Sequence, residues 1–261
     1  MKVAHWAYGK TSLNGGNGTG LNYAVEELVA AERLIGLDSV LLDPQIPEEV
    51  EKGGEVDVHV VHSNLPDRFH GHGKKVFFAH GMPEHCVIYE LRGTPDMPMA
   101  ASLYWLREAA TIVTQWPRHK RIWDLYLPDE KECRVVRSGV DLERWTPEGE
   151  KATLAGKPPL IFCESWFEVK RPLEFFWAFG ALARTPETAE ARLHIYNVPQ
   201  GQEPFWVSTL EHMNLRHWIQ NFQPKHPDPA QLYRAEGVVI CPAWYGDHSR
   251  TCLEAIACGS K

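Results

Sequence analysis

Several charged residues lie where predicted strands pass into predicted helices. Lys170 and Arg171 directly precede one helix, and two cations there can neutralise a diphosphate together with the helix dipole. Arg250 and Thr251 begin another helix after a buried strand and a polar loop, and Glu254 lies within its first two turns. Parallel α/β sheets bind ligands at such positions, because backbone N–H groups at the helix start point at anions. A solvated basic pair and a solvent-facing glutamate are the alternative interpretations.

A histidine and a glycine-rich loop occupy comparable positions in the first half of the chain. His80 directly follows an apolar strand, which is a catalytic position in parallel sheets, and histidine titrates near neutral pH. The loop 14–20 precedes a helix and contains Gly16, Gly18 and Gly20. Glycines let a backbone approach a phosphate closely and present N–H groups to it. A structural histidine and a flexible surface loop are the alternatives.

These candidate residues belong to a chain in which predicted strands and helices alternate. Apolar runs of strand length are followed by amphipathic helices, for example 21–34 and 172–183. This alternation predicts parallel sheets that helices cover on both faces. A polar stretch at 148–157 interrupts the pattern. We therefore expect an α/β protein of two Rossmann-like, doubly wound domains that face a cleft, 1–143 and 144–261, because a cleft between such domains is a common small-molecule site.

Composition narrows the function classes. The chain has 261 residues, 44% of them hydrophobic and 23% charged, which is typical of a globular protein. A net charge of −7 provides no electrostatic basis for nonspecific nucleic-acid binding. Six cysteines lack paired zinc spacing, so we expect reduced thiols and no metal site. There is no signal peptide and no apolar run of membrane-spanning length, so we expect a cytoplasmic protein without an integral membrane segment.

Five segments, in chain order, match the motif pattern of a known family. They are the glycine loop 14–20 with its helix, Ser138-Gly-Val-Asp-Leu-Glu-Arg-Trp-Thr-Pro147, Lys170, Pro229-Ala-Gln-Leu-Tyr233, and Leu253-Glu-Ala-Ile-Ala-Cys-Gly259. Together they resemble the retaining, GT-B-fold sugar-nucleotide transferases of glycosyltransferase family 4. The resemblance covers nearly the whole chain, and it rests on the order and spacing of the segments.

The chain departs from the family pattern at three places. Gly246 stands where the family normally has a second glutamate, and the neighbouring Asp247 is our candidate for contacting the donor sugar instead. Ser165 stands where an arginine is expected, so Arg171 or Arg250 would supply the second positive charge. Family members usually continue beyond the point where this chain stops. We therefore expect a short second domain, which is either a compact variant or a fragment.

The resemblance implies an enzyme that transfers a hexose-like sugar from a nucleotide-diphosphate sugar, such as a UDP- or GDP-sugar, with retention at the anomeric carbon. Cations and backbone amides, rather than a metal ion or a cofactor, would stabilise the departing diphosphate. His80 and Asp247 would be catalytic residues beside the donor sugar. The acceptor is not identified, and a glycan, a lipid, a small molecule and modified DNA all remain open. The implied donor-site residues are Gly16, Gly18, Gly20, Lys170, Arg171, Arg250, Thr251 and, on the ribose, Glu254.

Two other functions remain open at this point. The first is an NAD-dependent oxidoreductase that uses the glycine loop and Asp43 at the end of the second strand. It leaves the C-terminal motif unexplained. The second is a non-catalytic sugar-nucleotide-binding module, which Gly246, Ser165 and the short second domain favour.

Overall fold

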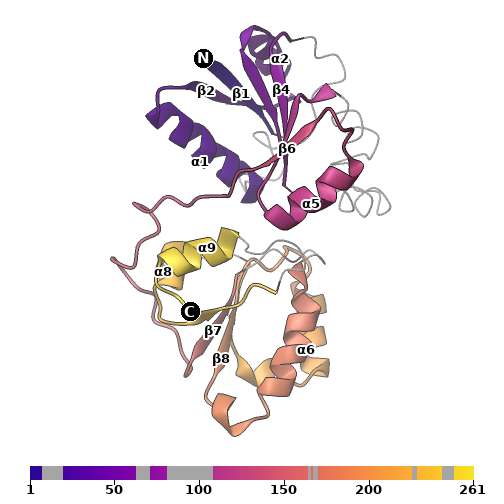
Figure 1. Ribbon diagram of the computed structural model, residues 1–261. Helices are drawn as coiled ribbons and strands as arrows, with labels where there is room; N and C mark the ends of the chain where they lie inside the picture. The colour runs from indigo at the N-terminus through magenta and orange to yellow at the C-terminus, as the bar shows by residue number, and fades with distance from the viewer. Residues whose placement is uncertain are drawn as a thin grey trace. The chain divides into compact units, whose positions relative to one another are not determined.

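The computed structural model describes residues 1–7, 20–62, 71–80, 108–163, 166, 170–224, 228–242 and 250–261. The chain forms two compact units, Met1–Arg137 and Ser138–Lys261, and each contains a parallel sheet (Figure 1). The division falls in the irregular segment between strand β6 (Glu132–Val135) and strand β7 (Pro159–Phe162), where the sequence-based boundary at 143/144 also lies.

The first unit is built on a six-stranded sheet in the order β2-β1-β3-β4-β5-β6, and all neighbouring strands are parallel. Besides β6, its strands are β1 (Lys2–Trp6), β2 (Asp38–Leu42), β3 (Val58–Val61), β4 (Lys74–Ala79) and β5 (Thr111–Thr114). Its described helices are α1 (Gly20–Leu34), α2 (Pro47–Lys52), a 3-10 turn at Gly53–Glu55, and α5 (Pro117–Tyr126).

Helices cover both faces of this first sheet. Successive strand residues point to opposite faces, so one strand packs against a different helix on each side. On one face Val25 and Val29 of α1 pack with Ala7. On the other face Trp123 of α5 belongs to the same buried cluster as Trp6 of β1. The first unit is therefore doubly wound, as the sequence predicts.

The second unit contains a four-stranded parallel sheet in the order β10-β7-β8-β9. Besides β7, its strands are β8 (Arg192–Ile195), β9 (Ile219–Phe222) and β10 (Val238–Val239). Its described helices are α6 (Pro172–Leu182), a 3-10 turn at Pro186–Thr188, α7 (Glu203–His212), a 3-10 turn at Arg216–Trp218, α8 (Pro229–Tyr233) and α9 (Arg250–Ala257).

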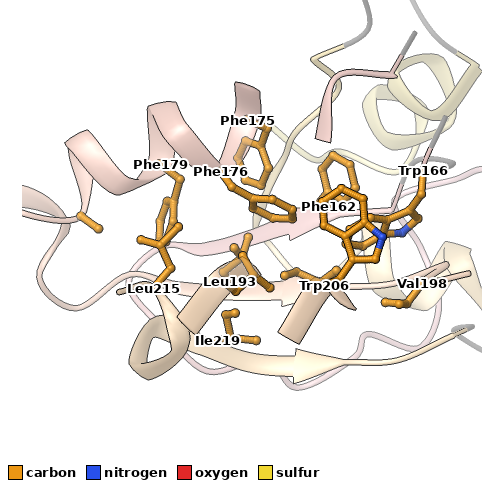
Figure 2. Packing of buried hydrophobic residues seen from close by; sticks show 13 residues of the cluster. Phe162, Trp166, Phe175, Phe176, Phe179, Leu193, Val198, Trp206, Leu215 and Ile219 are labelled. Atoms are coloured by element: carbon orange, nitrogen blue, oxygen red, sulfur yellow. The ribbon is translucent and has the colours of Figure 1, made fainter. Parts of the chain in front are cut away.

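An aromatic cluster fills one face of the second sheet (Figure 2). Phe162 at the end of β7 stacks on Phe175 of α6, with ring centroids 5.2 Å apart. Trp166 packs against Trp206 of α7 at 4.5 Å, and Phe176 is fully buried between these rings and the sheet. Rings packed in this way anchor α6 on the sheet, and the start of α6 carries two candidate site residues.

The opposite face of the second sheet is covered by α8 and α9. Ala230 and Leu232 of α8 and Ala255 of α9 are buried in one cluster with Ile161 of β7. Gly259 ends the α9 segment with φ 82, a left-handed conformation that glycine adopts without steric cost. The second unit is therefore also doubly wound. No helix in the described part of the chain is both long and apolar enough to cross a membrane.

Candidate functional site

The order of strands places a ligand-binding edge in each unit. In the first sheet the chain runs from β1 outward to β2 and then returns to the other side of β1 with β3. In the second it runs from β7 through β8 to β9 and returns to the other side of β7 with β10. Open α/β sheets bind ligands outside the carboxyl ends of strands at such reversal points. These edges are between β1 and β3, and between β7 and β10.

The edge of the second sheet brings together the two cation-bearing segments. Lys170 and Arg171 lie between β7 and the start of α6, and Arg250 begins α9 after β10. Because β7 and β10 are parallel neighbours, both helices start at the same edge of the sheet. The N-termini of both helices and the three cations make this edge suitable for an anion.

Arg171 holds an uncommon backbone conformation at this edge. Its φ of 48 and ψ of 49 lie in the left-handed region, which costs a non-glycine residue about 1–2 kcal/mol. Its Nε lies 3.7 Å from Oε1 of Glu174 in the first turn of α6. Backbone strain of this kind is concentrated at binding sites. The strained backbone of Arg171 and the positive charge of the segment therefore both favour a binding site at this edge.

Glu254 and Arg250 form a close ion pair along α9. Nε of Arg250 donates to Oε1 of Glu254 at 2.6 Å, with side-chain exposures of 23% and 11%. Thr251 is partly buried beside them. The alternative of a solvent-facing glutamate is wrong, because Glu254 is buried and charge-paired. The oxygens of a carboxylate at this position can accept hydrogen bonds from hydroxyl groups.

Asn197 is a residue at this edge that sequence reasoning missed. It follows β8 with φ 59, and its Nδ2 donates to the carbonyl oxygen of Cys163 at 3.0 Å, where β7 ends. Trp166 donates from Nε1 to the carbonyl oxygen of Tyr196 at 3.1 Å. These two bonds tie the exit of β7 to the exit of β8. An asparagine two residues after the end of a strand was the signal that could have identified it.

His80 lies at the carboxyl edge of the first sheet, directly after β4, where the sequence places it. Its Nε2 is 2.8 Å from Nδ1 of His62, and its ring stacks on Phe78 with centroids 4.8 Å apart. Burial lowers the pKa of His80 to about 4. The expectation that this histidine titrates near neutral pH is therefore wrong. His80 is a neutral imidazole at pH 7.

Two further histidines lie on the same face of the first sheet as His80. His5 on β1 and His62 directly after β3 are buried, and both are hydrogen-bonded. Burial, followed by the repulsion that His80 and His5 exert when they are protonated, lowers the pKa of His62 well below its usual value. Sequence analysis missed both residues. Their signal was a polar residue in or just after an apolar strand, a position that normally carries a core side chain.

Several candidate positions lie outside the described residues, namely Gly16, Gly18, Ser165, Gly246 and Asp247. Gly20 is the first residue of α1. Within the described ranges, no group of three or more His, Cys, Asp or Glu side chains is arranged to hold a metal ion.

Comparison with known proteins identifies the fold. No protein-family model and no curated protein matches the sequence. Among solved structures, sucrose-phosphate synthase from Thermosynechococcus elongatus has a TM-score of 0.72 at 14% identity, over 100% of this chain and 80% of that one. WaaG, a glycosyltransferase involved in lipopolysaccharide biosynthesis, has a TM-score of 0.68 at 13% identity, over 99% and 79%. Anabaena HepE in complex with UDP and glucose has a TM-score of 0.66 at 12% identity, over 100% and 79%. The chain has the GT-B glycosyltransferase fold.

Proposed function

We propose that this chain of GT-B fold is a glycosyltransferase. It would move a sugar from a nucleotide-diphosphate sugar to an acceptor hydroxyl, with retention at the anomeric carbon. One observation carries the proposal. The edge between β7 and β10 combines three cations, two helix starts and the buried carboxylate of Glu254. The UDP bound by Anabaena HepE, a protein of the same fold, supports a nucleotide as the ligand of this edge.

The second unit would bind the donor nucleotide. Breaking the bond between the sugar and the diphosphate leaves negative charge on the phosphate oxygens. Lys170 and Arg171 at the start of α6, with Arg250 at the start of α9, would stabilise that charge without a metal ion or an organic cofactor. Glu254 would accept hydrogen bonds from the ribose hydroxyls, because its carboxylate is paired with the guanidinium of Arg250 and lies close to the helix start.

The first unit would supply the environment of the reacting carbon and the acceptor. His80 is a neutral imidazole at the carboxyl edge, so it can hydrogen-bond a hydroxyl group without adding charge. We assign His80 to the donor sugar and the attacking hydroxyl, and Asp247 to the sugar hydroxyls. Gly16, Gly18 and Gly20 are assigned to the phosphates through their backbone amides.

The position of Asp43 argues against an NAD-dependent oxidoreductase. Such an enzyme uses an acidic residue at the end of the second strand to bind a ribose hydroxyl, and that residue must face the ligand. Asp43 is fully buried, and its Oδ1 accepts a hydrogen bond from the backbone N–H of Gln45 at 2.9 Å. Its carboxylate thus stabilises the turn after β2. Calorimetry with NADH is expected to detect no binding.

A thermal-shift screen against UDP, GDP and ADP and their glucose derivatives tests the proposal. A ligand that binds only the folded state raises the melting temperature, so one nucleotide is expected to stabilise the protein. Incubation of the stabilising sugar nucleotide with simple glycosides, followed by NMR of the product's anomeric proton, then tests transfer and retention. Binding without transfer or hydrolysis would favour a non-catalytic sugar-nucleotide-binding module. Absence of binding to every nucleotide would overturn the proposal.

A further inference from the structure

A continuous hydrogen-bonded chain crosses the first sheet. His5 donates from Nε2 to Oε2 of Glu32 at 2.8 Å, and its Nδ1 lies 2.9 Å from Nε2 of His62. Nδ1 of His62 lies 2.8 Å from Nε2 of His80. Gln115 donates from Nε2 to Nδ1 of His80 at 3.5 Å. The chain thus runs from α1 through residues of β1 and residues that directly follow β3, β4 and β5.

The strand register explains why these side chains meet. His5 pairs with Val60, so His62 lies two residues further toward the carboxyl edge on the same face. Val61 pairs with Phe77, which places His62 opposite Phe78, and His80 again lies two residues further along. From one histidine to the next, the position therefore shifts by one strand across the sheet and by two residues toward the carboxyl edge. The imidazole rings fill the diagonal, with centroids 5.2 and 5.1 Å apart.

The carboxylate at one end sets the direction of every hydrogen bond in the chain. An ionised carboxylate only accepts, so His5 must carry its proton on Nε2. When His5 carries only this proton, it accepts at Nδ1 from Nε2–H of His62, and His62 accepts at Nδ1 from Nε2–H of His80. His80 is left with a lone pair on Nδ1, which is the atom that Gln115 contacts. The tautomer of His80 is thus determined by Glu32, three hydrogen bonds away.

The two ends of the chain are accessible and its middle is not. The side chain of Glu32 is 19% exposed, and His80 and Gln115 are partly exposed at the carboxyl edge. His5 and His62 are buried. A metal site does not explain this arrangement, because ligand nitrogens converge on one point. Here His5 and His62 each use both ring nitrogens on different neighbours.

We propose that Glu32, His5 and His62 are positioning residues that form a proton relay between His80 and the surface. For its substrate, the relay rests on the glycosyltransferase function proposed above. The acceptor oxygen forms its bond to the anomeric carbon, and the carbon–phosphate-oxygen bond breaks with its electron pair on the diphosphate. The acceptor O–H takes the place of Gln115 at Nδ1 of His80 and gives its proton there. Nε2–H of His80 passes to His62, and Nε2–H of His62 passes to His5. The proton is finally held between His5 and Glu32.

Charges around the relay favour this direction of transfer. Within the described part of the chain, its titratable groups are Glu32 of α1, His5 of β1, and His62 and His80, which directly follow β3 and β4. Ser39 of β2 and Gln115 after β5 are neutral. Burial raises the pKa of Glu32, but hydrogen bonds from His5 and Ser39 outweigh it, so the net pKa lies below its usual range. An ionised Glu32 attracts the proton. Since a proton leaves Nε2 of His80 as another reaches Nδ1, the relay avoids a long-lived charge on this ring.

Nitrogen-15 NMR of histidine-labelled full-length protein tests the relay without any substrate. We expect His5, His62 and His80 to be protonated on Nε2. Glu32→Gln keeps the size of the side chain, but its amide can donate as well as accept, so the direction of the chain is no longer set. His80 in E32Q is therefore expected to become a mixture of Nδ1–H and Nε2–H tautomers. The matched control Glu26→Gln, at an exposed position of the same helix, is expected to retain the single tautomer.

Kinetics test the proton transfer. With the sugar nucleotide that stabilises the protein, E32Q is expected to lower kcat about 10-fold or more and to leave the donor KM within about 2-fold. His62→Gln places a side chain that does not titrate in the relay, so it should lower kcat in the same way. It replaces E32Q in the test if E32Q does not fold. An unchanged His80 tautomer in both variants, or unchanged kcat in both, would overturn the relay. A tautomer that responds to E32Q in a protein without transfer activity would support the relay and remove the glycosyltransferase assignment.

Discussion

Nε of Arg250 lies 2.6 Å from Oε1 of Glu254, one turn further along α9. The helix itself therefore holds a cation and an anion together at the edge of the second sheet. A ligand that forms a hydrogen bond with either side chain competes with the other side chain for it, so the two contributions to binding are coupled.

Glu254→Ala is expected to weaken binding of UDP or GDP, whichever stabilises the wild-type protein, at least about 10-fold, or about 1.4 kcal/mol. The variant removes the proposed ribose contact and releases Arg250 from its partner. Calorimetry measures the affinity. The nucleoside keeps the ribose but lacks the phosphates, so its affinity should fall to a similar extent. The exposed Glu187→Ala is the control, and unchanged nucleotide affinity in Glu254→Ala would disprove the ribose assignment.

Lys170→Gln is expected to weaken binding of the nucleoside diphosphate about 10-fold and to leave binding of the nucleoside nearly unchanged. Its charge lies at the start of α6, where it would act on phosphate and not on the base. Calorimetry at two salt concentrations should also give a smaller salt dependence for the variant. Lys157→Gln removes an exposed lysine of the same unit and is the control. An equal loss of diphosphate and nucleoside affinity would contradict a phosphate contact.

His80→Ala is expected to lower turnover about 100-fold while nucleotide affinity changes by less than about 2-fold. General acid–base or hydrogen-bonding groups at the reacting centre act mainly in the transition state. The measurements are kcat with the stabilising sugar nucleotide and a calorimetric titration with its nucleoside diphosphate. Exposed His212→Ala is the matched control. Loss of nucleotide affinity without loss of turnover would place His80 in donor binding instead.

The free energy of unfolding is expected to fall as the pH decreases from about 6.5 to about 4. The pKa of His80 is lowered to about 4 and that of His62 is lowered as well, so the unfolded chain binds more protons in this window. The shift of His80 alone contributes no more than about 3.5 kcal/mol. Urea denaturation at several pH values measures the slope. His62→Gln should flatten it, and a slope equal to the wild type would show that burial does not disfavour the charged ring.

Phe176→Ala is expected to destabilise the second unit by about 3–5 kcal/mol, because its ring is fully buried in the aromatic cluster (Figure 2). The neighbouring Trp177 is 70% exposed, so Trp177→Ala should change stability by less than about 0.5 kcal/mol. Urea denaturation followed by circular dichroism compares the two variants. Similar losses for both would mean that α6 does not pack on the sheet as described.

Local sequence determined the two doubly wound units and the placement of most candidate residues. Strand ends and helix starts are recognised from apolar periodicity, proline and glycine, which act over a few residues. Lys170 and Arg171 before α6, Arg250 at the start of α9, and His80 after β4 were predicted in this way. The short helix α2 was not predicted, since six residues carry too little periodicity.

Only the tertiary structure decided the order of strands and the neighbours of each side chain. The strand register places His5, His62 and His80 on one diagonal of the sheet. The spacing of these residues in the sequence does not predict that arrangement. Burial also decided that His80 is neutral at pH 7, because the cost of charging a group depends on every element that excludes water from it. Local patterns specify which residues reach an edge, and packing specifies their partners and charge.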